Sequence, residues 1–232
     1  MTTQAVLTAR QRVEALTGEL IVPLQSGYLG DQSFAVGALA RLRRGAGKEF
    51  SQVPDLWGLV DTGGLHTTPG EGVWPLSEVE LTRGEDALHV ALTLWALHQQ
   101  SRGTPMHRTH ASSSLRGLGA GVRALMPPGK AGDTTEAGEA VRKRLVRSGT
   151  APGLTVLSQR LRDIVVLLRG RAIPLDYAQL AGQLYRWQEP GGRDVVRREW
   201  GRSFHSYRPP QKAGTGTPAS DHLTDLTDKD AS

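Results

Sequence analysis

The most regular hydrophobic pattern of the chain lies in residues 154–168. Its apolar positions recur at three- and four-residue steps and are Leu154, Leu157, Leu161, Ile164, Val165 and Leu168. This spacing predicts a helix with one apolar stripe, and such a stripe has to face a protein core. The same spacing, bounded by capping residues, glycine or proline, predicts further helices. We expect them at residues 4–17, 31–44, 77–100, 115–126, 134–147, 174–187 and 193–207.

The helix expected at residues 77–100 differs from the others because it has little polar surface. Between Ala87 and Leu97 its apolar residues go almost all the way round the helix. A helix of this kind is buried at the centre of a bundle. The segments between helices are rich in glycine, proline or polar residues. We interpret them as a connector at 20–30, a short apolar turn or helix at 53–60, a loop at 61–75, and a polar loop that leaves the core at 101–114.

No segment alternates apolar and polar residues over the length of a strand, and no internal repeat of fixed period occurs. The sequence therefore predicts an all-α fold, a helical bundle of about eight or nine helices in two packed lobes. The residues at the end of the chain are mainly Thr, Gly, Pro, Ser and Asp, a composition typical of disorder. We expect an N-terminal helix and connector at 1–30, an all-helical domain at 31–208 with lobes at about 31–100 and 115–208, and a disordered tail at 209–232.

Length and composition exclude several classes of protein. A chain of 232 residues can build a hydrophobic core without disulfides or metals to hold it together. Without cysteine it has no disulfide framework and no thiolate metal site, which fits a reducing cytoplasm. No run approaches the roughly 18 apolar residues of a membrane span, and the N-terminus lacks the apolar middle of a signal peptide. We therefore expect a cytoplasmic protein with no membrane partner.

Positive charge is concentrated in one segment of the chain. The net charge of the whole chain is +5, whereas residues 141–171 alone carry +7, because their only acid is Asp163. Residues 209–232 carry −2, so the remaining parts sum to zero. A second basic cluster, Arg41, Arg43, Arg44 and Lys48, surrounds the end of the helix expected at 31–44. Clustered basic charge that acids do not offset is typical of proteins that bind a polyanion.

Motifs for catalysis, metal binding or nucleotide binding are incomplete. The segment RGAGK at 44–48 lacks the first glycine of a P-loop, since Leu42 stands there, and Glu49 follows it in place of Ser or Thr. His89 and His98 are nine residues apart on one helix and therefore point to opposite sides. No paired carboxylates and no serine in a GxSxG setting complete an active site. We expect no catalytic residue, no metal and no cofactor.

Basic residues fall into rows on two of the expected helices. Arg162 and Arg169 are seven residues apart and project from nearly the same side of one helix, while Arg160 projects from the other side. On the preceding helix, Lys143 and Arg147 stand four residues apart, away from the apolar face. Such rows can bind a phosphate backbone without reading its sequence. The alternatives are an ordinary solvated basic face and a helical protein–protein adaptor whose basic face docks an acidic partner subunit.

Several motifs of the chain resemble those of a known family. They are LRRG at 42–45, LWALHQ at 94–99, IPLDYAQL at 173–180 and REWGRSF at 198–204. In this order they are similar to the CasB family, the small subunit of the type I-E CRISPR Cascade complex, and the similarity covers residues 31–207. It implies an all-helical, non-enzymatic protein, of which two copies lie head to tail along the inner face of an RNA-guided antiviral complex.

The resemblance also implies partners and site residues. The partners are the guide RNA (crRNA), the target and displaced DNA strands, a second copy of the chain, and the other Cascade subunits: the large subunit, the backbone subunits and the guide-processing endonuclease subunit. The implied role is to stabilise the hybrid of guide RNA and target DNA and the displaced strand of the R-loop. The nucleic-acid-binding residues implied for this chain are Arg41, Arg43, Arg44, Lys48, Arg116, Arg123, Lys143, Arg144, Arg147, Arg160, Arg162, Arg169 and Arg171.

Overall fold

The fold is all-α, as the sequence predicts. The computed structural model describes residues 7–67, 75–110, 116–126 and 135–207, so the tail expected at 209–232 lies outside the described residues. Within them, the β contacts amount to one isolated bridge, between His107 and Leu175. The α-helices of the described residues are α1 (Ala9–Leu29), α2 (Ser33–Leu42), α3 (Gly63–His66), α4 (Glu78–Gln99), α5 (Leu118–Leu125), α6 (Glu136–Gly149), α7 (Leu154–Gly170), α8 (Tyr177–Trp187) and α9 (Gly192–Ser206). Short 3-10 helices are η1 (Arg43–Gly45), η2 (Phe50–Gln52) and η3 (Pro54–Leu56).

The central helix is α4, as its apolar sequence predicts. Ser77 caps its start, because the Ser77 hydroxyl accepts from the Glu80 N–H while the Glu80 carboxylate accepts from the Ser77 N–H. Every residue from Ala87 to Gln99 is buried. The helices α1, α2, α7 and α8 all pack against it. None of the described helices is long and apolar enough to cross a membrane.

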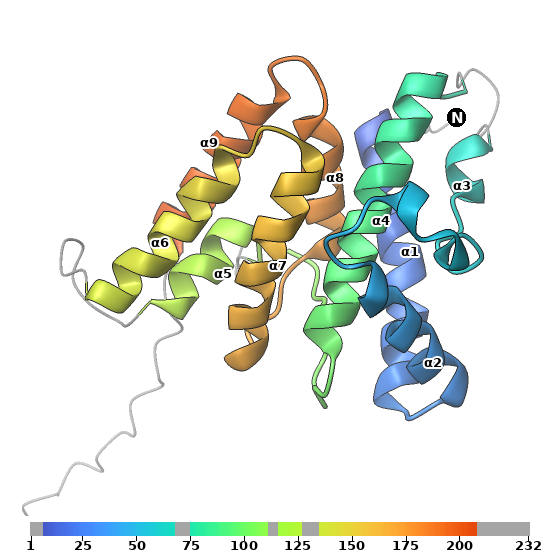
Figure 1. Ribbon diagram of the computed structural model, residues 1–232, viewed down its shortest axis with the longest axis horizontal. Helices are drawn as coiled ribbons and strands as arrows, with labels where there is room; N and C mark the ends of the chain where they lie inside the picture. Colours follow the sequence, from blue (N-terminus) through green and yellow to red (C-terminus); the bar gives the residue numbers. More distant parts are fainter. Residues whose placement is uncertain (1–6, 68–74, 111–115, 127–134, 208–232) are drawn as a thin grey trace, which may run out of the picture.

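The helix α8 connects the two halves of the chain. It packs against α1 and α4 from the first half and against α9 from the second. In Figure 1, α4 and α8 lie between α1, α2 and α3 on one side and α5, α6 and α9 on the other. The buried apolar residues form one continuous core to which every one of these helices contributes. The division into two lobes stays a prediction, and the contacts of α8 with α1 and α4 cross the boundary between them.

The N-terminal helix is longer than the sequence predicts. We expected it to end at Gly18 and a connector to follow at 20–30, but α1 continues through Gly18 and Pro23. A proline inside a helix removes one hydrogen bond and typically costs about 3 kcal/mol. Packing outweighs this cost, since Val13 and Ile21 are fully buried and α1 lies along α8 and α4. The prediction of a connector was therefore wrong, because tertiary contacts override the local signal.

The loop expected at 101–114 also differs, because its described part packs onto the core. Met106 and His107 are buried. The side-chain carbonyl of Gln99 accepts from the Met106 N–H at 2.9 Å, and that of Gln25 accepts from the His107 N–H at 2.8 Å. The amide side chains of buried Gln99 and half-buried Gln25 therefore satisfy the backbone donors of a segment whose composition suggested a solvated loop.

Element ends shift by a few residues from those expected. Pro174 was expected in the first turn of a helix, but α8 begins at Tyr177. Its N-cap is Asp176, whose carboxylate accepts from the Gln179 N–H at 3.0 Å. The helix expected at 31–44 ends as α2 at Leu42, and the chain continues as η1.

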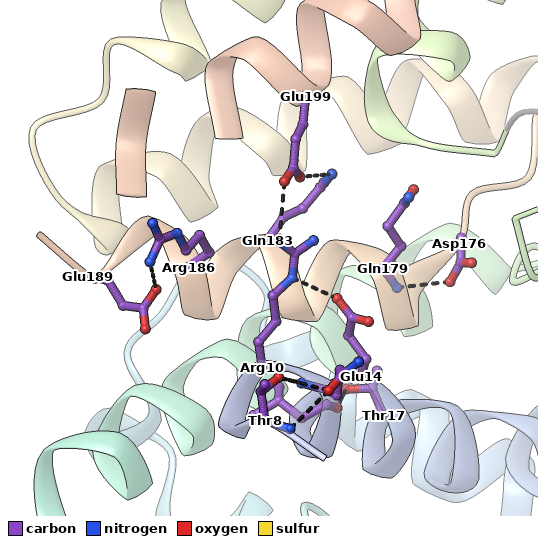
Figure 2. A network of polar contacts seen from close by, with 12 residues as sticks. Thr8, Arg10, Glu14, Thr17, Asp176, Gln179, Gln183, Arg186, Glu189 and Glu199 are labelled. Carbon is purple, nitrogen blue, oxygen red and sulfur yellow. Dashed lines mark hydrogen bonds and ion pairs between the residues drawn. The ribbon is translucent and has the colours of Figure 1, made fainter. Parts of the chain in front are cut away.

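A polar network ties α1 to α8 and α9 (Figure 2). Arg10 of α1 donates to Glu14 at 2.9 Å and to Glu199 of α9 at 3.2 Å. Glu199 also accepts from Gln183 of α8 at 2.9 Å, and the side-chain carbonyl of Gln183 accepts from the Trp200 indole at 2.7 Å. Burial raises the pKa of Glu14, although Arg10 lowers it in part. The network therefore holds the end of the chain against its beginning through partly desolvated charges.

The backbones of α5 and α9 approach closely at Gly119. A Cβ atom at this position would lie 2.0 Å from the carbonyl oxygen of Trp200 and 2.7 Å from the backbone nitrogen of Phe204. These are backbone atoms of α9, so they can move only if the whole helix moves. Glycine is therefore required where the two helices cross.

We expect Gly119→Ala to destabilise the protein by about 3 kcal/mol or more, because overpacking against backbone cannot be relieved by a side-chain rotation. Gly201→Ala is the matched control on α9, since no atom lies within 4 Å of its Cβ position. It should stabilise the helix by about 0.5–1 kcal/mol. Urea unfolding of both variants measures the difference, and equal stabilities would contradict the close approach.

Buried histidines predict a loss of stability in acid. His98 is fully buried, and its Nδ1 lies 2.8 Å from the hydroxyl oxygen of Tyr177. Burial lowers the pKa of His98 from 6.5 to about 3, and burial also lowers the pKa values of His89 and His107. In the unfolded chain these groups bind protons near pH 6.5, so their contribution to stability is complete above that pH and is lost as the pH falls toward the folded values.

From His98 alone we expect the free energy of unfolding to fall by roughly 1.5–2 kcal/mol between pH 6.5 and pH 5. Urea unfolding at a series of pH values measures this slope. The variant His98→Gln should be less stable at pH 7 but should lose less stability on acidification. Parallel pH profiles for the two proteins would rule out His98 as a source of the acid sensitivity.

Candidate nucleic-acid interface

A basic groove of about 250 Å³ runs between α6 and α7. The hydroxyl of Thr135 caps the start of α6, and the chain turns at residues 150–153 into α7. The residues that line the groove from α7 are spaced at i, i+3, i+4 and i+7, so they share one helix face. The lining consists of Arg144 and Arg147 of α6 together with Val156, Gln159, Arg160 and Asp163 of α7.

One arginine of the groove holds the two helices together. The guanidinium of Arg160 donates to the backbone carbonyl of Arg147. This carbonyl lies in the last turn of α6, where carbonyls lack partners within the helix and the helix dipole favours a cation. The side chains of Arg144 and Arg147 are exposed, and neither forms an ion pair within the described residues. Arg160 thus positions the end of α6 while the other two arginines stay available.

The second basic cluster meets this groove at Gly47. The backbone of Gly47 has φ of +85°, which residues with a Cβ rarely adopt. Its Cβ position would lie 3.5 Å from Cδ of Arg162 and 3.8 Å from Cγ of Gln159. The loop after η1 therefore packs on the same helix that carries the groove.

Two hydrogen bonds fix this loop. The Thr155 hydroxyl of α7 donates to the Glu49 carboxylate at 2.7 Å, and Nε2 of His89 in α4 lies 3.1 Å from the carbonyl oxygen of Lys48. They hold this loop against α4 and α7, and Gly47 thereby approaches Arg162, which is about a hundred residues away in sequence. We call the resulting set the α6–α7 basic surface, and it consists of Arg144, Arg147, Arg160 and Arg162. Lys48 is exposed on the loop beside it.

The predicted basic residues lack acidic partners. Among the described residues, none of the thirteen nucleic-acid-binding residues expected from the sequence forms an ion pair with a carboxylate. Other arginines of similar exposure are paired, as Arg142 is with Glu139 and Arg186 with Glu189. An unpaired guanidinium keeps its full charge for an external anion. The surface therefore presents positive charge that the protein itself does not neutralise.

Two of the thirteen expected nucleic-acid-binding residues make hydrogen bonds that connect elements of the fold. Arg41 donates to the carbonyl of Asp55 at 2.5 Å and so connects α2 to η3. Arg169 donates to the Gln100 side chain at 2.8 Å and approaches the Leu97 carbonyl at 3.4 Å. It therefore caps the C-terminal end of α4, about two turns along α7 from Arg162.

The remaining six lie at four places. Lys143 is exposed on α6 beside Arg144, and Arg171 is exposed directly after α7. Arg116 and Arg123 are half-buried at α5, and Arg43 and Arg44 belong to η1, where only the latter is exposed. The structure thus brings the loop that follows the first basic cluster against Arg162 of the second, and it leaves the α5 residues outside the α6–α7 basic surface.

Sequence reasoning missed further exposed arginines on α9. Arg193, Arg198 and Arg202 are exposed and form no ion pair in the part of the chain that the structure describes. Gly149 at the end of α6 lies against Arg197 of α9, with 3.2 Å between its Cβ position and Cγ of the arginine. The signal was present as the basic run RDVVRREWGR. No group of three His, Cys, Asp or Glu that could hold a metal occurs among the described residues.

Comparisons with known proteins match this chain to one family and to a solved structure with a similar fold. The model of the family CRISPR-associated protein Cse2 matches residues 38–205. The crystal structure of CasB from Thermobifida fusca is 42% identical to this chain with a TM-score of 0.70, and the match covers 84% of this chain and 98% of that one. A search of curated proteins gives no match.

We expect Gly47→Ala to loosen the loop that carries Lys48, because a Cβ in the left-handed region costs about 1–2 kcal/mol. The measurement is amide hydrogen exchange at Lys48, whose N–H donates to the Gly45 carbonyl at 2.9 Å. Exchange there should become faster, while the free energy of unfolding should fall by no more than this cost of about 1–2 kcal/mol. Gly58→Ala is the control, since it is exposed and no atom lies within 4 Å of its Cβ position. Equal exchange in both variants would mean that the backbone at Gly47 does not hold the loop.

Proposed function

The chain belongs to the CRISPR-associated Cse2 family, the small subunit of the type I-E Cascade complex, and we propose that it binds nucleic acid through the α6–α7 basic surface. In this role it is a non-catalytic subunit. It stabilises the hybrid of guide RNA and target DNA together with the displaced strand. The remaining Cascade subunits and a second copy of the chain are its protein partners, in the cytoplasm.

One observation carries the proposal: unpaired basic side chains from separate elements gather on one surface. Each exposed Arg or Lys that neutralises a phosphate releases condensed counterions, and this supplies affinity without sequence recognition. The groove between α6 and α7 offers only Asp163 as a competing acid. Base-edge contacts are not needed, because guide pairing reads the sequence in an RNA-guided complex.

The proposed role follows from the energetics of strand exchange. The RNA–DNA hybrid that forms is about as stable as the DNA duplex it replaces, so the exchange is nearly balanced. A protein surface that attracts the backbone of the hybrid or of the displaced strand therefore shifts the balance toward the open state. Modest electrostatic contacts are sufficient for this purpose, and tight binding by the isolated subunit is not required.

We expect the double variant Arg147→Gln with Arg162→Gln to weaken binding of mixed-sequence single-stranded DNA. The slope of log K against log salt should become shallower by about 1.4, since each phosphate contact contributes about 0.7 for single strands. The measurement is fluorescence anisotropy of labelled DNA with the full chain at several salt concentrations. The matched control is Arg142→Gln with Arg186→Gln, which removes the same charge from arginines that are already paired.

The control should change the slope much less than the double variant does. Equal slopes for the wild type and the double variant would exclude the α6–α7 basic surface as the binding site. If the wild-type chain shows no salt-sensitive binding to single- or double-stranded DNA or to RNA, the adaptor with an acidic partner subunit becomes the better hypothesis.

A further inference from the structure

A second pocket, of about 510 Å³, lies on the other side of the loop that carries Lys48. It is enclosed by this loop, by the first half of α4 and by the start of α7. The net charge of its lining is negative, in contrast to the α6–α7 basic surface, because three carboxylates and one lysine line it. These charged residues are Lys48, Glu49, Glu85 and Asp86.

Two of the three carboxylates are already engaged, and one is free. Glu49 accepts from the Thr155 hydroxyl at 2.7 Å, and Glu85 lies 3.1 Å from Nε2 of His66. Asp86 forms no hydrogen bond or ion pair with any described residue. Burial, followed by the charges of Glu49 and Glu85, raises the pKa of Asp86. A cation in the pocket would relieve this unfavourable arrangement of charge.

Two buried polar atoms in the pocket wall also lack partners. Nδ1 of His89 and Oγ of Ser158 have no hydrogen-bond partner among the described residues, and both side chains are at least 98% buried. Nε2 of His89 faces the Lys48 carbonyl and therefore carries the proton, so Nδ1 is left as an acceptor. Burial lowers the pKa of His89, which keeps the ring neutral. Unpaired buried polar atoms are unfavourable, so this wall is suited to a ligand that donates hydrogen bonds.

Aromatic rings form the rim. The Phe50 ring lies 5.3 Å from the His89 ring and 6.2 Å from the Trp57 ring. Trp57 is 56% exposed, and its indole N–H donates to the Phe50 carbonyl at 3.3 Å, which fixes its orientation. Exposed, oriented aromatic rings beside carboxylates are the surroundings in which a planar cation stacks favourably.

We propose that this pocket binds the guanidinium group of an arginine on a partner protein. A guanidinium is planar and carries only donors, so it matches carboxylate and imidazole acceptors below and aromatic faces at the rim. A lysine offers no planar group for stacking. A nucleotide would bring its phosphate toward an excess of negative charge, which disfavours it. The proposal is independent of nucleic-acid binding, which uses the opposite side of the loop.

The probe for this chemistry is N-acetyl-arginine methylamide, with N-acetyl-citrulline methylamide as its uncharged isostere. Titration into the full chain is followed by the NMR signal of the Trp57 indole N–H, which the variant Trp57→Phe identifies. We expect a saturable shift with the arginine probe and none with the citrulline probe. Asp86→Asn should weaken the arginine response at least about fivefold, because it removes a charge-assisted hydrogen bond. Asp163→Asn, the acid of the α6–α7 groove, is the control and should leave the response unchanged.

The second measurement uses the assembled complex. Asp86→Asn should lower the amount of this subunit that copurifies with its sister subunits, while Asp163→Asn should not. Thermal unfolding of Asp86→Asn separates these effects from misfolding, and we expect unchanged or higher stability, since a half-buried unpaired charge is removed. Binding of single-stranded DNA by the isolated variant should be unaffected, so this inference and the proposed function can fail separately.

Three outcomes would overturn the proposal. They are the absence of a saturable response to the arginine probe, an equal response to citrulline, and wild-type assembly of the Asp86→Asn variant. A response of Trp57 to cytidine monophosphate that Asp86→Asn does not weaken would instead identify a base-stacking site.

Discussion

The burial of α4 is the constraint on which the rest of the structure depends. From Ala87 to Gln99 no side chain faces solvent, so neighbouring helices have to cover this stretch from every direction. The helices α1, α2, α7 and α8 do so, and they come from both halves of the chain. Polar side chains within the stretch are therefore committed to the fold, as the contact of His98 with Tyr177 illustrates. Because α7 is fixed against α4 through its apolar stripe, its polar face has to point outward, and this face carries the arginines.

The distribution of ion pairs follows from the same packing. Some carboxylates form ion pairs at partly buried contacts between helices, as Glu14 and Glu199 do with Arg10. On α6 and α7 the apolar stripes pack against the core, and no described carboxylate pairs with the arginines of the α6–α7 basic surface. Arg160 shows that even here one guanidinium can serve the fold through a helix end while its neighbours remain unpaired. The unneutralised charge is thus a property of how these two helices pack, and the net charge of the chain alone does not reveal it.

Hydrophobic spacing predicted the helices that bury an apolar stripe or their whole surface. It failed for segments whose structure depends on contacts with residues far away in sequence. The helices α4, α6, α7 and α9 lie where their apolar positions place them. The continuation of α1 through Pro23 depends on its packing against α8, and the burial of Met106 depends on the amide of Gln99, so neither has a local signal. Among the site residues, the rows on α6 and α7 could be found from spacing. The approach of Gly47 to Arg162 could not, since nothing near either residue in sequence indicates the other.

The loop between η1 and η2 separates two surfaces of opposite charge. On one side Gly47 contacts Arg162, and on the other Glu49 and Phe50 line a pocket with Asp86. An extended polyanion that follows the arginines is repelled at this pocket, so the loop limits how far a phosphate backbone can run across α7 toward α4. A cationic partner, conversely, is repelled by the arginines and attracted to the carboxylates. Two partners of opposite charge can therefore contact the same small protein on neighbouring surfaces without competing, because the loop that separates the surfaces is itself held to α4 and α7 by His89 and Thr155.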